Sequence, residues 1–467
     1  MDGLTARIAK RTAEVANAEL VPSDVEIVRR LLLDNAIVSL WGSTRPAVQQ
    51  VTAWASRFAG SGSCHILASD WTAEASTAAL VHGMAGHAYE LDDTHDATTS
   101  HPGCVIIPAA LAVASELRAS QDHFFRAIAA GYEAMALIGT ASGGLVTVHR
   151  GFHPTAIYGS FGAAAAVICL RALAADAAVD PALLVTAWGH ALSQASGSMQ
   201  FSLESAGGEV KRLHAGLAAR NGVLAADFAA LDQVTAPQQS VEGTYGAAAS
   251  FGGPLRDIRE DGPLQIRVIS FKPYSCCRLF HSTIDALRDV TDDFSVPLED
   301  ICDILVSGPR LIAEQHMTAA ESTMTAQYSC PYIVGATLTY GPQRYDAYGE
   351  SFLTDERILS TAAKVRFEVD SELEAAYFPD HFPTRVQMWF SDGSTRTALV
   401  VDSVGTTQHP MSTEQILAKG AGLTEAGGFP TAAELAAAIW DPTLPAAELA
   451  ALYARPTNRS NQQGRLQ

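Results

Sequence analysis

Residues 89–103 read Tyr89-Glu90-Leu91-Asp92-Asp93-Thr94-His95-Asp96-Ala97-Thr98-Thr99-Ser100-His101-Pro102-Gly103, with four carboxylates, two imidazoles and four aliphatic hydroxyls. Apolar segments with helical spacing flank them, over residues 72–89 and 105–116. Burying unpaired polar groups is costly, and four neighbouring carboxylates do not satisfy one another. The stretch therefore predicts a pocket between buried helices, completed by cations from elsewhere in the chain.

Length and charge bound the class of protein. The chain has 467 residues, more than one ordinary core accommodates, so we expect two domains. Its hydrophobic content of 48% and mean hydropathy of +0.10 describe a globular protein. The formal net charge of -19 disfavours nucleic acid as a partner, because phosphates require a basic face. An anionic substrate would need its own local group of Lys, Arg and His.

Cysteine usage and hydropathy predict a reducing, cytoplasmic setting. The seven cysteines are scattered and form no C-x-x-C pair, so neither a disulfide framework nor a zinc site is indicated. Residues 1–10 have no signal-peptide core. The most apolar run, residues 159–170, is short and is followed by Arg171, so we expect no membrane span.

Helical periodicity dominates the first half of the chain. Ala- and Leu-rich helical patterns recur over residues 124–141, 154–175, 181–197 and 210–231. The run Ser23-Asp24-Val25-Glu26 matches a capping box at the start of an earlier helix. We therefore expect a mostly α-helical domain over residues 1–262.

The pattern changes near Pro263. Strands are expected over residues 264–271, 302–306, 364–369, 385–390 and 395–401, with helices over 277–288 and 331–340. Helix-capping signals return at Ser412 and Thr431, each followed three residues later by Gln or Glu. Residues 263–404 are thus predicted to form a smaller α+β domain, inserted into the helical domain that residues 405–467 rejoin. The last residues, 455–467, are polar and are expected to be loose.

Three predicted helix N-termini each carry a cationic or protonatable side chain. His101 and His153 each precede a proline that suits the start of a helix, and Lys211 follows a glycine pair. Free N–H groups and the helix dipole favour carboxylates at such positions, and His and Lys can also transfer protons. Each residue is more often a cap or a solvated side chain when it stands alone. Their coincidence in one acidic chain favours a functional site.

Several motifs, in order along nearly the whole chain, resemble those of the MmgE/PrpD family. They are Glu90-Leu91-Asp92-Asp93-Thr94 with His101-Pro102, Gly151-Phe152-His153-Pro154-Thr155-Ala156, Lys211-Arg212-Leu213-His214-Ala215-Gly216-Leu217-Ala218-Ala219-Arg220-Asn221-Gly222, and Lys272-Pro273-Tyr274-Ser275-Cys276-Cys277. The block that begins at Lys211 is the most specific. The Cys-Cys pair, the following His281 and the spacing to His101 are similar to those of the fungal-type decarboxylases of this family.

The resemblance implies a fold, a partner and a site. Members of the family have a mostly α-helical large domain, built from both chain ends, and a smaller α+β lid, and they usually form homodimers without a cofactor. In the decarboxylase branches the pocket lies between the domains. Asp93 and Thr94 are expected to orient the histidines. The positions that match the family's motifs are, in this chain, Glu90, Asp93, Thr94, His101, His153, Lys211, Lys272, Cys277, His281 and Tyr332.

The implied roles are those of acid–base chemistry on carboxylates. We expect Lys211 and His101 to hold substrate carboxylates or to deliver protons, with His153 as the second acid or base. Tyr332 would donate a hydrogen bond, and Cys277 would line the pocket without acting as a nucleophile. No metal-ligand spacing is present, so no metal is expected. With imidazoles as proton carriers, activity should change across neutral pH.

The resemblance implies a cofactor-independent lyase that acts on a small di- or tricarboxylic acid by proton transfer next to a carboxylate. A decarboxylase of the cis-aconitate type is the leading interpretation. A dehydratase of the 2-methylcitrate type and an epimerase of the iminodisuccinate type are the alternatives among enzymes. The alternative of another class is a sensor that binds a polycarboxylate without catalysis.

Overall fold

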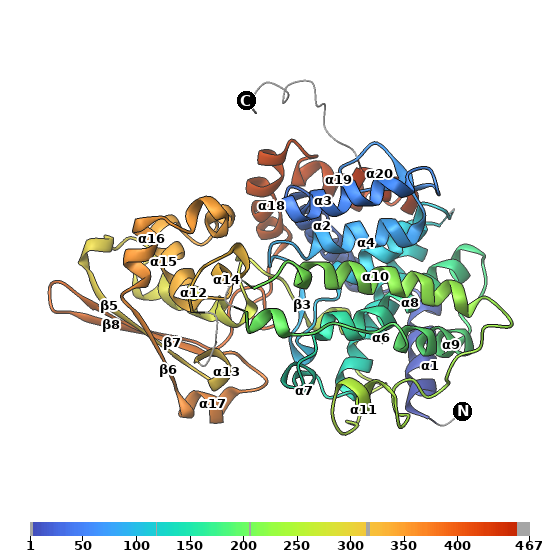
Figure 1. The fold of residues 1–467 in the computed structure, drawn as a ribbon, viewed down its shortest axis with the longest axis horizontal. Coiled ribbons are helices and arrows are strands. Elements are labelled where there is room, and N and C mark those ends of the chain that lie inside the picture. The colour runs from blue at the N-terminus through green and yellow to red at the C-terminus, as the bar shows by residue number, and fades with distance from the viewer. Residues whose placement is uncertain (1–2, 118, 205–206, 314–317, 455–467) are drawn as a thin grey trace.

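The computed structural model describes residues 3–117, 119–204, 207–313 and 318–454, arranged as a large helical body and a smaller body with a four-stranded sheet (Figure 1). Each body has its own apolar core. The larger core gathers residues from Ile8 to Phe271 and again from Met411 to Tyr453, whereas the smaller core runs from Tyr274 to Phe390. The predicted class, a mostly α-helical large domain with a smaller α+β domain, is confirmed.

The described residues of the helical domain begin with eleven α-helices: α1 Leu4–Asn17, α2 Pro22–Gly42, α3 Pro46–Ala55, α4 Ala75–Gly86, α5 Gly103–Ala114, α6 Gln121–Ala141, α7 Leu145–His149, α8 Pro154–Ala174, α9 Pro181–Leu192, α10 Val210–Ala229 and α11 Ala247–Phe251. Four of the predicted helices are present as α6, α8, α9 and α10. At the centre lies α8, which packs on α6, α10 and α5. It is long and apolar enough to cross a membrane, but 89% of its most apolar window is buried inside the protein, as in a core helix.

The predicted capping box at Ser23 is wrong. The helix α2 begins at Pro22, two residues earlier than a cap at Ser23 implies, and its N-cap, Val21, makes no side-chain cap. Proline has the backbone angle that the first helical position requires, so it replaces a polar cap there. Asp24 instead accepts two hydrogen bonds from Arg267, at 2.7 and 2.8 Å.

Two glycines let α4 and α10 approach closely. A Cβ on Gly83 would lie 2.8 Å from an atom of Gly216, and a Cβ on Gly216 would lie 2.2 Å from the carbonyl oxygen of Leu80. Any larger residue would push the helices apart. The approach brings the end of α4 beside the start of α10, where Arg212 Nη1 donates to the carbonyl oxygen of His87 at 3.4 Å.

The smaller domain is built on the strands β5 Ile301–Gly308, β6 Val365–Val369, β7 Thr384–Phe390 and β8 Thr395–Val400, in the order β6-β5-β7-β8. β5 and β6 are parallel, and the other two pairs are antiparallel. These four strands were predicted. Alternate residues of β7 are buried, and α12, His281–Val290, packs on β7 and β8. The other α-helices described in the smaller domain are α13 Arg310–Ala313, α14 Thr323–Ala326, α15 Cys330–Tyr340, α16 Glu356–Ala362 and α17 Ser371–Tyr377.

The prediction of one strand over residues 264–271 is wrong. Residues 265–268 form a single 3-10 turn, held where the backbone N–H of Gln265 donates to Glu133 at 2.8 Å. The following strand, β4 Ile269–Ser270, pairs with β3 Thr94–His95 of the helical domain and not with the sheet of the smaller domain. This pairing brings the polar stretch 89–103 and the motif that begins at Lys272 to one place. Two further short strands, β1 Cys64–His65 and β2 Thr72–Ala73, pair with each other.

The chain returns to the helical domain through α18 Thr413–Gly427, α19 Ala432–Trp440 and α20 Ala446–Ala454, at the red end of Figure 1. The helices α18 and α19 pack on α2, and α20 packs on α5. The capping boxes predicted at Ser412 and Thr431 are confirmed. Lys419 of α18 donates to Asp34 at 2.7 Å and to the carbonyl oxygen of Leu91 at 2.8 Å, so it fastens the polar stretch to the core. Residues 455–467 lie outside the described residues.

Candidate active site

A cavity of about 220 Å³, the inner cavity, lies between the two cores, and both domains line it. Among the described residues, three cations and two carboxylates are in its wall, so this part of the lining carries a surplus of positive charge in a chain of net charge -19. Its polar lining residues are Glu90, Thr94, Asp96, Thr99, His101, His153, Ser202, Lys211, Lys272, Cys277, Arg278 and Tyr328. The sequence predicted seven of these positions.

The carboxylate of Glu90 gathers three buried cations. Lys211 Nζ and Arg212 Nη1 donate to its Oε1, and Lys272 Nζ donates to its Oε2 at 3.0 Å. Burial opposes the charge on Glu90, but the three cations outweigh it and hold the pKa of that carboxyl well below its usual value. The residue also has a left-handed φ of 55°, which is uncommon outside glycine. An anionic substrate in the inner cavity would therefore compete with Glu90 for the same cations.

Asp92, beside the predicted Asp93, contacts two histidines. His87 Nδ1 lies 2.7 Å from Asp92 Oδ2, and His101 Nδ1 lies 3.4 Å from the same oxygen. Burial opposes the charge on Asp92, but its neighbours His87, His101 and Lys272 hold the pKa of the carboxyl well below its usual value. Asp92 therefore places a negative charge beside the imidazole of His101.

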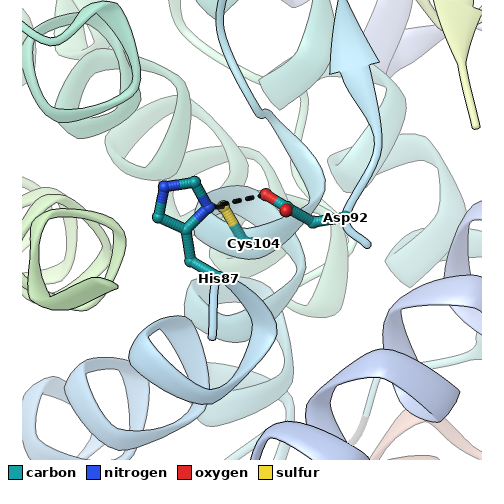
Figure 2. A group of neighbouring side chains, drawn as sticks. All are labelled: His87, Asp92 and Cys104. Carbon is teal, nitrogen blue, oxygen red and sulfur yellow. Dashed lines mark hydrogen bonds and ion pairs between the residues drawn. The ribbon is translucent and has the colours of Figure 1, made fainter. Parts of the chain in front are cut away.

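Cys104 completes this group, with its Sγ 3.6 Å from His87 Nδ1 (Figure 2). Histidine, aspartate and cysteine can together ligate a transition metal. Two observations favour hydrogen bonding instead. Burial raises the pKa of the Cys104 thiol well above its usual value, and Lys272 Nζ lies 4.0 Å from Asp92, where it would repel a bound cation. We assign the group to positioning Asp92.

The main chain of Asp93 orients His101. His101 Nδ1 lies 2.9 Å from the carbonyl oxygen of Asp93, and Thr94 Oγ1 lies 3.4 Å from the same nitrogen. A carbonyl oxygen can only accept, so Nδ1 carries the proton and the neutral ring has its lone pair on Nε2. The carboxylate of Asp93 instead accepts from the N–H of Gly103 at 2.7 Å and from Tyr132 at 2.6 Å. Burial raises the pKa of Asp93 to about 7.

Both histidines of the inner cavity are neutral at neutral pH. Burial lowers the pKa of His101 to about 3. His153 is the N-cap of α8, as predicted, and its Nδ1 lies 3.2 Å from His214 Nδ1. Burial, reinforced by the charge of Lys211, lowers the pKa of His153 well below its usual value. These lowered pKa values argue against imidazole titration near neutral pH in the unliganded protein. The change of activity across neutral pH stays a prediction.

Two groups in the wall hold a proton at neutral pH. Burial lowers the pKa of Lys211 to about 8, against the pull of Glu90. The hydroxyl of Tyr328 donates to Glu90 Oε1 at 3.3 Å, and the Lys211 ammonium lies 5.3 Å from the centre of the Tyr328 ring. Burial, reinforced by Glu90, raises the pKa of Tyr328 well above its usual value. Lys211 can thus exchange a proton near neutral pH, whereas Tyr328 can donate a hydrogen bond.

Cys277 and Lys272 reach the inner cavity as predicted. Burial raises the pKa of the Cys277 thiol to about 11, so this residue is not a thiolate at neutral pH and is a poor nucleophile. Lys272 enters the cavity wall fully buried and bonded to Glu90.

The other three predicted residues, Asp93, Tyr332 and His281, are not in the wall of the inner cavity; the carboxylate of Asp93 accepts from Gly103 and Tyr132 instead. The hydroxyl of Tyr332 donates to the carbonyl oxygens of Ala347 and Phe352, both at 2.9 Å, inside the smaller domain. His281 begins α12, and its Nε2 lies 3.3 Å from the carbonyl oxygen of Cys276. Neither side chain is in the cavity wall.

The sequence analysis assigned no role of their own to four residues with direct contacts in this site. Asp92 and Arg212 stand beside residues that were chosen, and Arg278 directly follows the Cys-Cys pair, so position within a motif was an available signal. Tyr328 lies four residues before Tyr332 and outside every quoted motif, and no local pattern distinguishes the two.

The fold and the site together define a two-domain protein with a buried, cation-rich acid–base cavity between its domains. Its sequence matches the MmgE/PrpD N-terminal domain over residues 6–256 and the MmgE/PrpD C-terminal domain over residues 274–441. The chain belongs to the MmgE/PrpD family, as its motifs predicted.

Three curated relatives illustrate the similarity. The cis-aconitate decarboxylase-like protein oryM of Aspergillus oryzae is 29% identical over 421 residues, which are 82% of this chain and 84% of the relative. The cis-aconitate decarboxylase of Aspergillus terreus is 26% identical over 89% of this chain and 88% of its own length. The cis-aconitate decarboxylase of Mus musculus is 23% identical over 83% of this chain and 80% of its own length.

Proposed function

We propose that this protein is a cofactor-independent lyase that decarboxylates cis-aconitate by proton transfer next to a carboxylate. The observation that carries the proposal is the inner cavity, where Lys211 and Lys272 converge beside two neutral imidazoles. Cations in a desolvated cavity suit a substrate with several carboxylates. The substrate is that of the Aspergillus relatives, which are named as a cis-aconitate decarboxylase and a cis-aconitate decarboxylase-like protein.

The proposed reaction needs a site for negative charge and a proton donor. Loss of carbon dioxide breaks the bond between one carboxylate and its saturated carbon, and the electron pair moves into the adjacent unsaturated carboxylate. Lys211 and Lys272 would stabilise that charge. One proton then adds to carbon, so a trianion and a proton give carbon dioxide and a dianion. Lys211 supplies this proton and regains it from solvent, because its pKa of about 8 keeps it charged at neutral pH.

A second candidate function is favoured by the state of the two histidines. Dehydration of a 2-methylcitrate-type substrate and epimerisation of an iminodisuccinate-type substrate both begin with removal of a proton from carbon. Neutral imidazoles are bases, and His101 has its free lone pair on Nε2. A polycarboxylate sensor would need the same cations and none of this proton transfer.

The deciding experiment incubates the protein with cis-aconitate, 2-methylcitrate and iminodisuccinate in deuterated water and follows each by NMR. A decarboxylase releases carbon dioxide and leaves one deuterium on a product carbon. A dehydratase shows loss of water, and an epimerase shows exchange of a carbon-bound proton with solvent. Binding of a ligand with none of these changes would replace the proposal by the sensor.

We expect kcat/KM to fall as the pH rises through about 8. Below this pH Lys211 is an ammonium, and above it the side chain is neutral, which removes both a positive charge and a proton from the inner cavity. The profile of kcat/KM reports the unliganded protein, to which this pKa applies. The matched variant is Lys211→Arg, whose guanidinium does not deprotonate. Its residual activity should lack the alkaline fall, and a fall that persists would assign the titration to another group.

We expect two tyrosine substitutions to have opposite consequences. Tyr328→Phe should lower kcat by about tenfold or more, because it removes a donor at the cation cluster of the inner cavity. Tyr332→Phe should leave kcat within about twofold and lower the free energy of unfolding by about 1–3 kcal/mol, since two buried carbonyls lose their donor. Steady-state kinetics and urea unfolding on both variants measure these effects. If Tyr332→Phe lowered kcat more than Tyr328→Phe did, Tyr332 would be the tyrosine that acts in the site.

The family resemblance also implies a cytoplasmic homodimer, and we propose this state for the chain. Light scattering of the purified protein should then give twice the chain mass of 49.3 kDa. A measured mass equal to that of one chain at micromolar concentration would contradict the proposed dimer.

A further inference from the structure

Arg278 stands between two cavities. It lines the inner cavity, and it also lines a second cavity of about 440 Å³, the outer cavity, which is bounded by both domains. Asp96 and Phe382 are likewise common to the two walls. These three side chains therefore form the partition between the two cavities.

The contacts of Arg278 leave part of its guanidinium unused. The side chain is 8% exposed, Nη1 donates to Ser403 Oγ at 2.7 Å, and Nη2 donates to Asp96 Oδ2 at 3.4 Å. Arg278 Nε and Asp96 Oδ1 are both buried with no hydrogen-bond partner among the described residues. A charge-assisted bond between such groups is ordinarily 2.7–2.9 Å long. The pair is thus loose and unsaturated, with the side chain of Arg278 buried and that of Asp96 25% exposed.

The carboxylate of Asp96 also has a hydrogen bond that does not involve Arg278. Ser270 Oγ donates to the same Asp96 oxygen at 2.6 Å, beside the pairing of β3 with β4. Asp96 therefore keeps its place when Arg278 turns away from it, and Ser403 can follow or release the guanidinium. The guanidinium of Arg278 can therefore donate to another carboxylate with better hydrogen-bond geometry than Asp96 offers.

The inner cavity consequently has two separate cationic positions. One is the pair of lysines bonded to Glu90, and the other is Arg278, for which the described contacts show an acidic partner in Asp96 alone. The lysines can hold one end of a polycarboxylate. A ligand with a further carboxylate would find Arg278 in the same wall.

We propose that Arg278 binds one carboxylate of the substrate and thereby sets a preference for tricarboxylates over dicarboxylates, with Asp96 as its partner in the unliganded protein. The inference rests on the proposed function for its substrate class. It adds a specificity-determining residue that lies in neither the Glu90 cluster nor the histidine group.

The test compares two unreactive ligands by calorimetry: tricarballylate, and methylsuccinate, which lacks one of its carboxylates. The wild-type protein should bind tricarballylate at least about thirtyfold more tightly than methylsuccinate. In Arg278→Gln the ratio of the two dissociation constants should fall to within about threefold. Arg278→Lys should have an intermediate ratio because it keeps the charge. Methylsuccinate itself should bind the wild type and Arg278→Gln about equally.

Two further variants distinguish binding from a structural role. Asp96→Asn removes the competing carboxylate, so tricarballylate should bind a few-fold more tightly than to the wild type, about two- to tenfold. A merely structural ion pair would weaken binding of both ligands in Asp96→Asn as well as in Arg278→Gln. Arg259→Gln removes a cation that lines the outer cavity alone, and it should leave the ratio unchanged.

Three outcomes would overturn the inference: a wild-type ratio near one, an equal loss for both ligands in Arg278→Gln, or a loss of the ratio in Arg259→Gln. The calorimetry needs no turnover, so it separates this inference from the proposed function. A protein that discriminates through Arg278 but does not convert cis-aconitate would refute only the decarboxylase. A protein that converts cis-aconitate with an unchanged ratio in Arg278→Gln would refute only the role of Arg278.

Discussion

Lys211→Ala should lower kcat/KM for the substrate by at least about a hundredfold while the protein stays folded. The ammonium of Lys211 lines the inner cavity, and its pKa of about 8 lets it stabilise charge and give up a proton near neutral pH. The fold should survive because Glu90 still receives Arg212 and Lys272. Truncating the Lys211 side chain also opens space directly beside the inner cavity, and water can fill that space.

A second lysine provides the control for this substitution. Lys364 Nζ donates to the backbone carbonyls of Leu298 at 3.0 Å and Ile301 at 2.7 Å, in the smaller domain and outside the wall of the inner cavity. Lys364→Ala should keep kcat/KM within about threefold and lower stability slightly. Steady-state kinetics and thermal melts followed by circular dichroism compare the two variants. Near-normal turnover in folded Lys211→Ala would remove this lysine from the chemistry.

The sequence predicted the parts of the fold that local periodicity determines. The Ala-rich helices α6, α8, α9 and α10 were found because their apolar spacing repeats over several turns, and the hairpin of β7 and β8 because its strands alternate around a tight turn. Residues 264–271 were assigned wrongly for the same reason. Their β-rich composition could not reveal that β4 pairs with β3, which lies far away in the sequence and outside the four-stranded sheet.

Site residues at helix starts were predicted from local signals, whereas the contacts between residues far apart in the sequence were not. His153 and Lys211 stand at or beside the starts of α8 and α10, which the sequence marks with proline and glycine. The bond between Glu90 and Lys272 joins residues 182 positions apart, so no spacing rule indicates it. The protonation of His101 depends on complete burial, which becomes visible only in the folded chain.

Glu90→Gln should lower the free energy of unfolding by roughly 3–5 kcal/mol, because it removes the carboxylate that three buried cations share. The amide is close in shape to the carboxylate, so the loss reports charge and not volume. The left-handed backbone of residue 90 is retained in the variant, and its strain is no longer offset by the ion pairs. Urea unfolding followed by circular dichroism measures the difference.

The variant should also respond more strongly to a ligand than the wild type does. Tricarballylate offers carboxylates to Lys211 and Lys272, so it can replace the charge that Glu90→Gln removes, and its stabilising effect should exceed that on the wild type. Glu133→Gln is the matched control, since Glu133 is a buried carboxylate that accepts from Arg11 and from the backbone of Gln265, both at 2.8 Å. Glu133→Gln should have a lower free energy of unfolding, but tricarballylate should not stabilise it more than it stabilises the wild type. If Glu90→Gln is as stable as the wild type, or if tricarballylate rescues both variants equally, Glu90 is not the counter-charge that organises the inner cavity.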